Sequence, residues 1–215
     1  MDKHSLRKSI GREEFSYQSL LVALENYKAP LQKINELLKS KQIVRIKKGL
    51  YVIQPDETKS YNPLLLANLI YGPSYISFET ALSYWGLIPE RVETIQSVTS
   101  KKNKEFNTPV GVYTYRYLNK DRYKLAVLLE KQADGDHIFM ASPEKALIDY
   151  MTLSLSKKTK ARFIDVLEDL RIDESELIKQ IKLSSLRSLV QHYNHPLCLE
   201  FLIYMESKIE EQQNG

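Results

Sequence analysis

The stretch KQIVRIKKGLYV, residues 41–52, has the pattern of a basic β-hairpin. Two short runs of β-branched and other apolar residues flank Lys47-Lys48-Gly49, and glycine supplies the positive φ that a tight hairpin turn needs. Three cations, Arg45, Lys47 and Lys48, are expected at the tip and on the outer face. The apolar side chains are expected to pack inward, namely Ile43, Val44, Ile46, Leu50 and Val52.

The segment before the hairpin, PLQKINELLKSK at residues 30–41, has the apolar spacing of an amphipathic helix. Pro30 suits the first helical position. One side of the helix carries the residues that we expect to pack on the preceding helix, namely Leu31, Ile34, Leu37 and Leu38. The opposite side carries Gln32, Asn35, Glu36 and Lys39. Two earlier segments, SLRKSIG at 5–11 and FSYQSLLVALENY at 15–27, are also predicted to be helical.

Positive charge is concentrated around this helix and hairpin. Residues 28–48 carry seven Lys or Arg and one acid, Glu36, so their net charge is +6 in a chain whose net charge is +4. A confined basic patch is typical of proteins that bind a polyanion. Gln and Asn side chains can bond to adenine edges in the major groove, and Lys side chains can bind phosphates.

The order helix, short turn, helix and basic hairpin therefore predicts a winged helix-turn-helix over residues 1–54. We expect this domain to bind double-stranded DNA, with the hairpin as its wing. The predicted DNA-binding residues are Lys28, Gln32, Lys33, Asn35, Lys39, Lys41, Arg45, Lys47 and Lys48.

The rest of the chain is predicted to be a linker, residues 55–61, followed by a second domain, residues 62–215. Helices are expected at 62–72, 77–86 and through most of the chain after 143, and strands at 93–100 and 137–141. FNTPVGVYTYRYL at 106–118 predicts a hairpin whose second strand places Tyr113, Tyr115 and Tyr117 on one face. The predicted fold class is α+β, with a mixed α/β second domain that ends in a helical segment.

Composition excludes several classes of protein. No apolar run approaches the roughly 20 residues of a membrane span, and the start MDKHSLRKS lacks the apolar stretch of a signal peptide. A single cysteine, Cys198, cannot form an internal disulfide. We therefore expect a cytoplasmic protein without membrane association.

Two short motifs have residue types that occur in catalytic or metal sites. Ser142-Pro143-Glu144-Lys145 matches the S-x-x-K pattern of some acyl-transfer enzymes, but a serine cap followed by proline and glutamate is also a strong helix start. His192 and His195 have helical-like spacing, but Pro196 follows directly and Cys198 is the only soft ligand nearby. We favour the structural interpretation of both motifs, so no catalytic residue, metal or cofactor is predicted.

Three segments of the second domain resemble a known family: GPSYISFETALSYWGLIPE at 72–90, SVTSKK at 97–102 and SPEKALIDY at 142–150. Together with the basic hairpin, they resemble the AbiEi-type antitoxins of AbiE (type IV) toxin–antitoxin systems, over about residues 12–155. The resemblance implies a bacterial protein that represses its own operon by binding promoter inverted repeats. It also implies that the second domain counters an AbiEii-like nucleotidyltransferase toxin, in phage defence by abortive infection.

The residues that act on the toxin pathway are less defined. The resemblance leaves open a direct complex with the toxin, and it carries over no catalytic residue. A basic surface is one hypothesis, formed by Lys101, Lys102, Lys104, Arg116, Lys120 and Arg122. Two alternatives remain: a transcriptional regulator without a toxin partner, and a protein-interaction module whose basic segment binds another protein.

Overall fold

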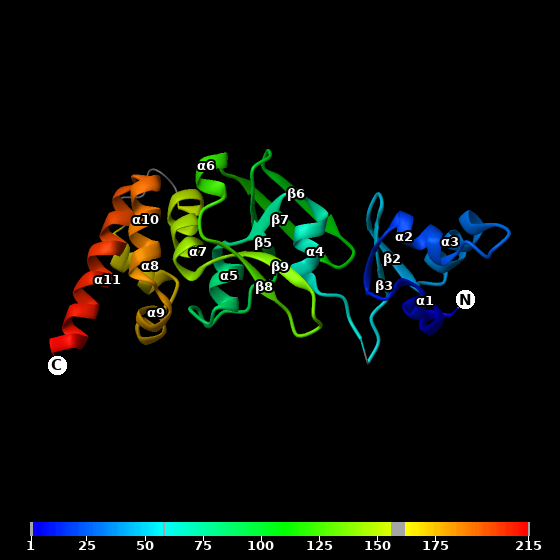
Figure 1. Cartoon of the computed structure of the whole chain (residues 1–215), viewed down its shortest axis with the longest axis horizontal. Helices are drawn as coiled ribbons and strands as arrows, with labels where there is room; N and C mark the ends of the chain where they lie inside the picture. Colours follow the sequence, from blue (N-terminus) through cyan, green and yellow to red (C-terminus); the bar gives the residue numbers. More distant parts are fainter. Residues whose placement is uncertain (1, 58, 156–161, 215) are drawn as a thin grey trace.

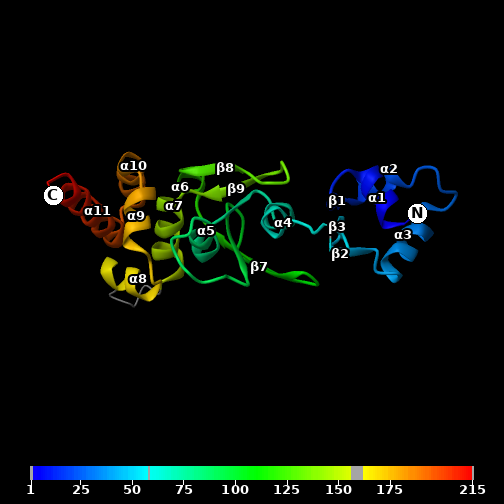
Figure 2. The ribbon, with the colours of Figure 1, turned by 90° about the horizontal axis from the view of Figure 1, so that it is seen from below.

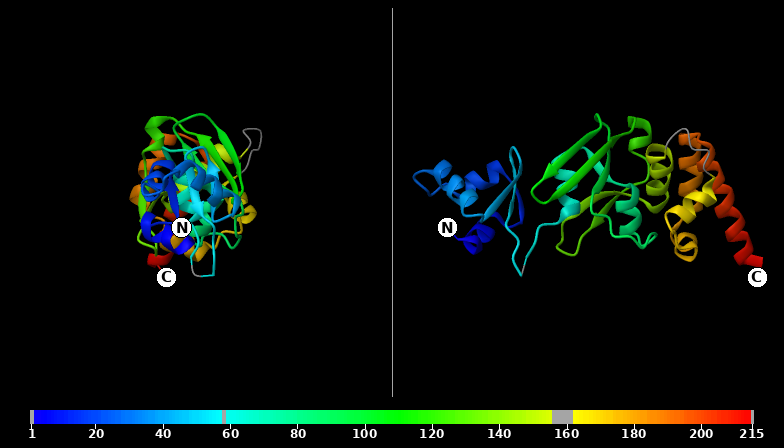
Figure 3. Two further views of the ribbon diagram at one scale, coloured as in Figure 1. Left: turned by 90° about the vertical axis from the view of Figure 1, so that its right-hand side faces the viewer. Right: turned by 180° about the vertical axis from the view of Figure 1, so that it is seen from behind.

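The computed structural model describes residues 2–57, 59–155 and 162–214 (Figure 1). The chain is elongated: a small N-terminal unit, a central sheet with its helices, and a group of C-terminal helices follow one another along the long axis. The two ends of the chain lie at opposite ends of the molecule (Figure 3).

The N-terminal unit, residues 2–53, combines helices with a three-stranded antiparallel sheet of order β1-β3-β2. The Asp2 side chain caps the first helix, Pro30 begins the third, and Gly49 has a φ of 86° at the hairpin turn. The elements are α1 (Lys3–Ile10), β1 (Glu14–Ser16), α2 (Tyr17–Ala23), α3 (Pro30–Lys39), β2 (Ile43–Lys47) and β3 (Leu50–Ile53).

The helix predicted over residues 15–27 is wrong at its start. Ser16 is the N-cap of α2, and its hydroxyl accepts a hydrogen bond from the backbone N–H of Ser19. The chain before a cap is extended, and here Phe15 pairs with Tyr51 in the sheet and stacks on its ring. Strand β1 was missed because its partner lies far along the sequence.

The hairpin sheet is apolar on both faces. Phe15, Ile43, Tyr51 and Ile53 share a hydrophobic cluster with the helices of the N-terminal unit. Ile46, Leu50 and Val52 instead belong to the larger cluster that contains the central sheet. The predicted inward packing of the apolar hairpin residues is therefore confirmed. They pack toward two sides, because side chains of a strand alternate between two faces and both are covered. Figure 2 shows β1, β2 and β3 on the side of the unit that faces α4.

The central part of the described chain contains a six-stranded mixed sheet of order β6-β7-β5-β4-β9-β8. Strand β4 pairs in parallel with β9, and β5 pairs in parallel with β7, whereas the other pairs are antiparallel. The strands are β4 (Ser74–Ile76), β5 (Ile95–Thr99), β6 (Lys104–Thr108), β7 (Gly111–Tyr117), β8 (Val127–Lys131) and β9 (His137–Ala141).

Helices flank this sheet, and others follow it. The elements around the sheet are α4 (Pro63–Ile70), α5 (Phe78–Tyr84), α6 (Lys120–Tyr123), α7 (Pro143–Asp149) and a π-helical turn, η1 (Tyr150–Ser154). The C-terminal helices are α8 (Phe163–Asp169), α9 (Glu174–Gln180), α10 (Leu183–Tyr193) and α11 (Pro196–Asn214). Residues 156–161 of the basic stretch SLSKKTKAR lie outside the described residues.

Most predicted elements of this region are present, so the chain has a mixed α and β fold. Strands β4 and β8 were not predicted, since each is short and lacks clear alternation. The predicted tyrosine face is correct for Tyr113 and Tyr115, which are buried, but Tyr117 is 51% exposed at the strand end. The domain limits at residues 54 and 62 stay predictions, and the hairpin shares its core with the central sheet. Within the described ranges, no helix is long and apolar enough to cross a membrane.

Candidate nucleic-acid interface

Helix α3 turns a polar face to the solvent. Gln32, Asn35 and Lys39 are exposed, whereas Ile34 and Leu37 on the opposite side are buried with the core of the N-terminal unit. The helix lies on the side of this unit away from the central sheet (Figure 2). The exposed face is therefore open to a large ligand.

One residue of α3 contradicts the predicted apolar stripe. Leu31 is 62% exposed and belongs to neither hydrophobic cluster of the described residues. It lies in the first turn of the helix, before the part that packs through Ile34 and Leu37. Leu31 therefore borders Asn35, one turn further on, at the edge of the polar face.

The cations predicted to bind DNA differ in their surroundings. Lys28, Lys41, Arg45 and Lys48 are exposed. Lys33 is half-buried, with its ammonium 3.0 Å from the Glu36 carboxylate and 5.8 Å from the ring centre of Tyr27. This ion pair with Glu36 reduces the charge that Lys33 offers to a phosphate.

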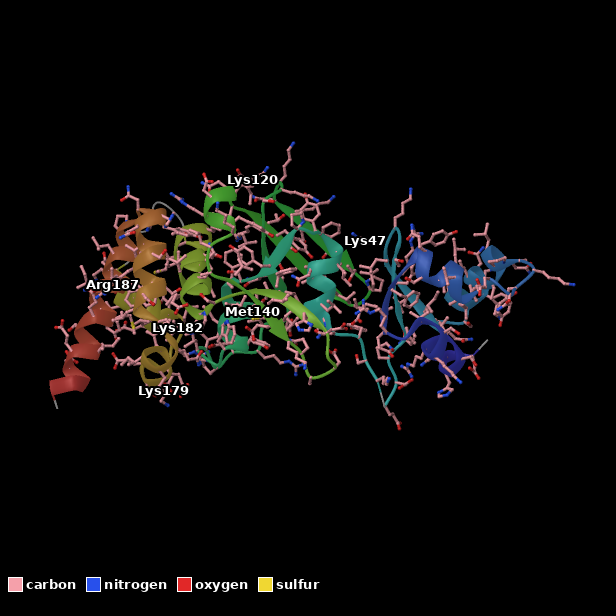
Figure 4. All side chains as sticks on the ribbon, viewed as in Figure 1. Lys47, Lys120, Met140, Lys179, Lys182 and Arg187 are labelled. Atoms are coloured by element: carbon pink, nitrogen blue, oxygen red, sulfur yellow. The ribbon has the colours of Figure 1, made fainter. Side chains whose placement is uncertain are left out.

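Lys47 does not lie at the outer face as predicted. Its side chain is half-buried, and its ammonium donates a hydrogen bond to the carbonyl oxygen of Ile70 at the end of α4. Figure 4 shows Lys47 between the hairpin and the central part of the chain. Burial, and then the charges of Lys101 and Lys104, lower the pKa of Lys47. The register of β2 shifts between Arg45 and Lys47, which interrupts the alternation of the strand. Lys47 therefore faces the contact between the hairpin and the central sheet, whereas Arg45 faces the solvent.

Lys47, Lys101 and Lys104 form a lysine cluster where the hairpin meets the central sheet. The Lys101 ammonium donates to the carbonyl oxygen of Gly72, and Lys104 lies 5.0 Å from the ring centre of Phe106. The C-terminal end of a helix is electronegative, which explains why two of these lysines bind carbonyls at or just beyond the end of α4. Within the described ranges, none of the three forms an ion pair with a carboxylate.

Further polar contacts join the N-terminal unit to the central sheet. Arg12 forms an ion pair with Asp136, and the buried carboxylate of Glu14 accepts a hydrogen bond from the backbone N–H of Asn62. Burial raises the pKa of Glu14. These contacts hold the N-terminal unit against the central part of the chain.

Two of the six residues predicted for a toxin-pathway surface act as internal tethers. The Arg116 guanidinium donates to the carbonyl oxygen of Leu153 at 2.9 Å. That of Arg122 donates to the carbonyl oxygens of His192 and Tyr193 at 3.2 and 3.0 Å. Lys102 and Lys120 are exposed, and Figure 4 shows Lys120 on α6.

A buried polar network centred on Asp149 was not predicted from the sequence. The Asp149 carboxylate accepts hydrogen bonds from the hydroxyls of Tyr75, Ser77 and Tyr193 at 2.8, 2.9 and 2.6 Å. The Lys145 ammonium lies 3.2 Å from the same carboxylate, and both side chains are fully buried. Burial lowers the pKa of Lys145, although Asp149 opposes this effect. The network ties β4 and α7 to the C-terminal helix α10.

The Ser142-Glu144-Lys145 motif contributes to this structure. The Ser142 hydroxyl caps α7 by accepting from the Lys145 N–H, as predicted, and it donates to the Glu144 carboxylate at 2.6 Å. Glu144 lies in the first turn of α7, as predicted, and it is also buried and accepts from the Lys182 N–H at 2.6 Å. Lys145 points to Asp149, so this motif does not bring serine and lysine together as nucleophile and base.

His192, His195 and Cys198 do not form a metal-binding cluster among the described residues. In the described parts of the chain, no group of three or more His, Cys, Asp or Glu could hold a metal ion. The imidazole Nδ1 of His192 lies 2.7 Å from the carbonyl oxygen of Ser188 in its own helix. Cys198 is buried, and burial raises the pKa of its thiol to about 12.

Comparisons with known proteins support the fold alone. No family model and no curated protein matches the sequence. A solved structure, the RV2827C protein from Mycobacterium tuberculosis, is similar with a TM-score of 0.60 and 16% sequence identity. The similarity covers 94% of this chain and 76% of that one. The mixed arrangement of helices and sheets thus recurs in a protein of distant sequence.

Proposed function

We propose that this chain is a DNA-binding repressor that acts in the cytoplasm, with residues 1–54 as a winged helix-turn-helix. The observation that carries the proposal is the exposed face of α3, where Gln32, Asn35 and Lys39 stand free of the core. The element order of the N-terminal unit, helix-strand-helix-helix-hairpin with sheet order β1-β3-β2, supports it. So does the exposure of Arg45 and Lys48 on the hairpin.

In this proposal, α3 enters the major groove of double-stranded DNA. Gln32 and Asn35 bond to base edges, and Lys39, Arg45 and Lys48 bind phosphates on either side. Lys47 is not among the phosphate ligands, because it already donates to Ile70. Lys101 and Lys104 extend the positive field from the hairpin onto the central sheet and strengthen long-range attraction.

We further propose that the repressor is the antitoxin of an AbiE-like pair and counters a nucleotidyltransferase-like toxin. This part rests on the resemblance in residues 72–90, 97–102 and 142–150. The first and last of these segments meet in the fold, since Tyr75 and Ser77 both donate to Asp149. The buried residues of these segments therefore belong to the core around the central sheet, and we expect exposed residues to form the surface that opposes the toxin.

A reporter assay tests the repressor. The DNA upstream of the reading frame drives a reporter, and the chain is supplied from a second plasmid. We expect the wild-type chain to lower expression severalfold and a Gln32→Ala/Asn35→Ala variant to lose the effect while it remains folded. Unchanged expression with the wild-type chain would contradict the proposal.

Co-expression tests the antitoxin. A neighbouring reading frame for a nucleotidyltransferase should arrest growth when expressed alone, and this chain should restore it. Restoration by the full-length Gln32→Ala/Asn35→Ala variant, together with its loss of repression, would show that the two activities depend on different residues. Repression without restoration would identify a regulator that has no toxin partner.

A further inference from the structure

Leu31 is an apolar side chain on the otherwise polar face of α3. It is 62% exposed, while Ile34 and Leu37 of the same helix are 5% and 1% exposed. Its neighbour on the open face, one turn on, is Asn35, and Gln32 is also exposed in the same first turn. The side chain contributes nothing to either hydrophobic cluster of the described residues, so the packing of the protein does not explain it.

The major groove of DNA offers one apolar group, the 5-methyl of thymine. Thymine pairs with adenine, whose N6 and N7 atoms are the partners of Gln and Asn side chains. A helix that presents Gln32 and Asn35 together with an apolar side chain can therefore contact both bases of A·T pairs. The amide side chains contact adenine, and the apolar side chain contacts the methyl group of thymine. Leu31 lies in the first turn, and the N-terminal residues of a recognition helix are those that reach base edges.

We propose that Leu31 is a specificity residue that contacts a thymine methyl group, so that α3 selects a site containing A·T pairs at that position. This inference rests on the proposed DNA binding. The proposed contact between Leu31 and the thymine methyl group carries no charge and releases no counterion. Removal of the side chain therefore weakens binding to the preferred site and leaves the salt dependence unchanged, unlike the removal of a phosphate-binding lysine.

The size of the effect follows from the area involved. Burial of one methyl group changes affinity by about fourfold. Leu31→Ala is expected to weaken binding to the preferred duplex by about that factor or somewhat more, because the isopropyl group beyond Cβ is lost. The substitution leaves folding intact, since the side chain is largely exposed.

The test uses duplexes selected from a random library by the wild-type chain, so no operator has to be known. Each selected duplex is prepared with thymine and with deoxyuridine, which lacks the 5-methyl group but keeps the pairing. Affinities are measured for wild type, Leu31→Ala and the control Leu199→Ala. Leu199 is a 51% exposed leucine on α11, so it matches the chemistry of the change at a distant place.

We expect wild type and Leu199→Ala to bind the deoxyuridine duplex at least about threefold more weakly than the thymine duplex. Leu31→Ala should bind the two duplexes equally. Equal binding of both duplexes by wild type would overturn the inference and leave the DNA-binding proposal standing. An equal loss in wild type and Leu31→Ala would overturn it too, because the methyl group would then act elsewhere. Failure of the wild-type chain to select any duplex would refute the proposed function, and this inference with it.

Discussion

The phenolic hydroxyl of Tyr75 donates a hydrogen bond of 2.8 Å to the carboxylate of Asp149, 74 residues further along the chain. Tyr75 belongs to β4 in the middle of the central sheet, and Asp149 ends α7. The same carboxylate binds Tyr193 at the end of α10 and faces the Lys145 ammonium. A single buried charge pair thus connects the sheet to the C-terminal helices.

Replacement of Asp149 should destabilise the protein strongly. Asp149→Asn leaves the Lys145 ammonium buried without its counter-charge, and breaking a buried ion pair costs about 3–5 kcal/mol in free energy of unfolding. Urea denaturation measures the loss. The exposed pair of Arg162 and Asp165 supplies the control, because Asp165→Asn should barely shift the midpoint. Similar midpoints for both variants would show that the buried network contributes little.

The protein should lose stability at alkaline pH. Burial raises the pKa of Tyr75, Tyr113, Tyr115 and Tyr193 above the ordinary value of 10.0. The unfolded chain releases these phenolic protons near pH 10 while the folded chain keeps them, so the stabilisation is complete below pH 10 and falls as the pH rises above it. The lowered pKa values of Lys145 and Lys47 act in the opposite direction, but these are two groups against the four tyrosines.

Phenolate absorbance during an alkaline titration tests this prediction. Of the 14 tyrosines, the buried ones should ionise only when the fold is lost, in one step that coincides with the change in circular dichroism. A smooth titration of all the tyrosines near pH 10 with the fold intact would contradict it.

The predictions from sequence succeeded where the signals are local. Pro30, Gly49 and Ser142 each determine a helix start or a turn through their own chemistry, so α3, the hairpin and α7 were predicted. The burial of Glu144 and Lys145 was not, because their partners are a distant backbone N–H at Lys182 and a hydroxyl at Tyr193.

The candidate site shows the same division. The residue types on α3 and the charge of the hairpin are visible in the sequence. The direction of the Lys47 side chain and the exposure of Leu31 are not visible in the sequence. Both depend on which residues of the N-terminal unit are covered by the central sheet and which by the core of the unit itself. A helical-wheel projection of α3 places Leu31 on the apolar side, but the buried residues of the helix begin one turn later, at Ile34.

The cations of the hairpin should separate into two classes. Lys48→Gln should lower the slope of log affinity against log salt by about one unit, the value for one phosphate contact. Lys47→Gln should leave that slope unchanged and change stability by no more than about 1 kcal/mol, because the lost hydrogen bond to Ile70 is offset by the removal of a partly buried charge beside Lys101 and Lys104. Salt-dependent binding and urea denaturation of the two variants measure these effects. A lower slope for Lys47→Gln instead of Lys48→Gln would mean that Lys47 leaves the Ile70 carbonyl to bind DNA.

The most direct test of the central claim is a gel-shift titration over a salt series with the DNA upstream of the reading frame. Wild type is compared with Lys39→Gln/Arg45→Gln/Lys48→Gln and with the control Lys179→Gln/Lys182→Gln/Arg187→Gln. The control removes the same number of exposed cations from the C-terminal helices (Figure 4). We predict discrete complexes for wild type and the control that weaken steeply with salt, and none for the first variant. Equal binding by all three proteins, or no binding by wild type, would contradict the assignment of DNA binding to α3 and the hairpin.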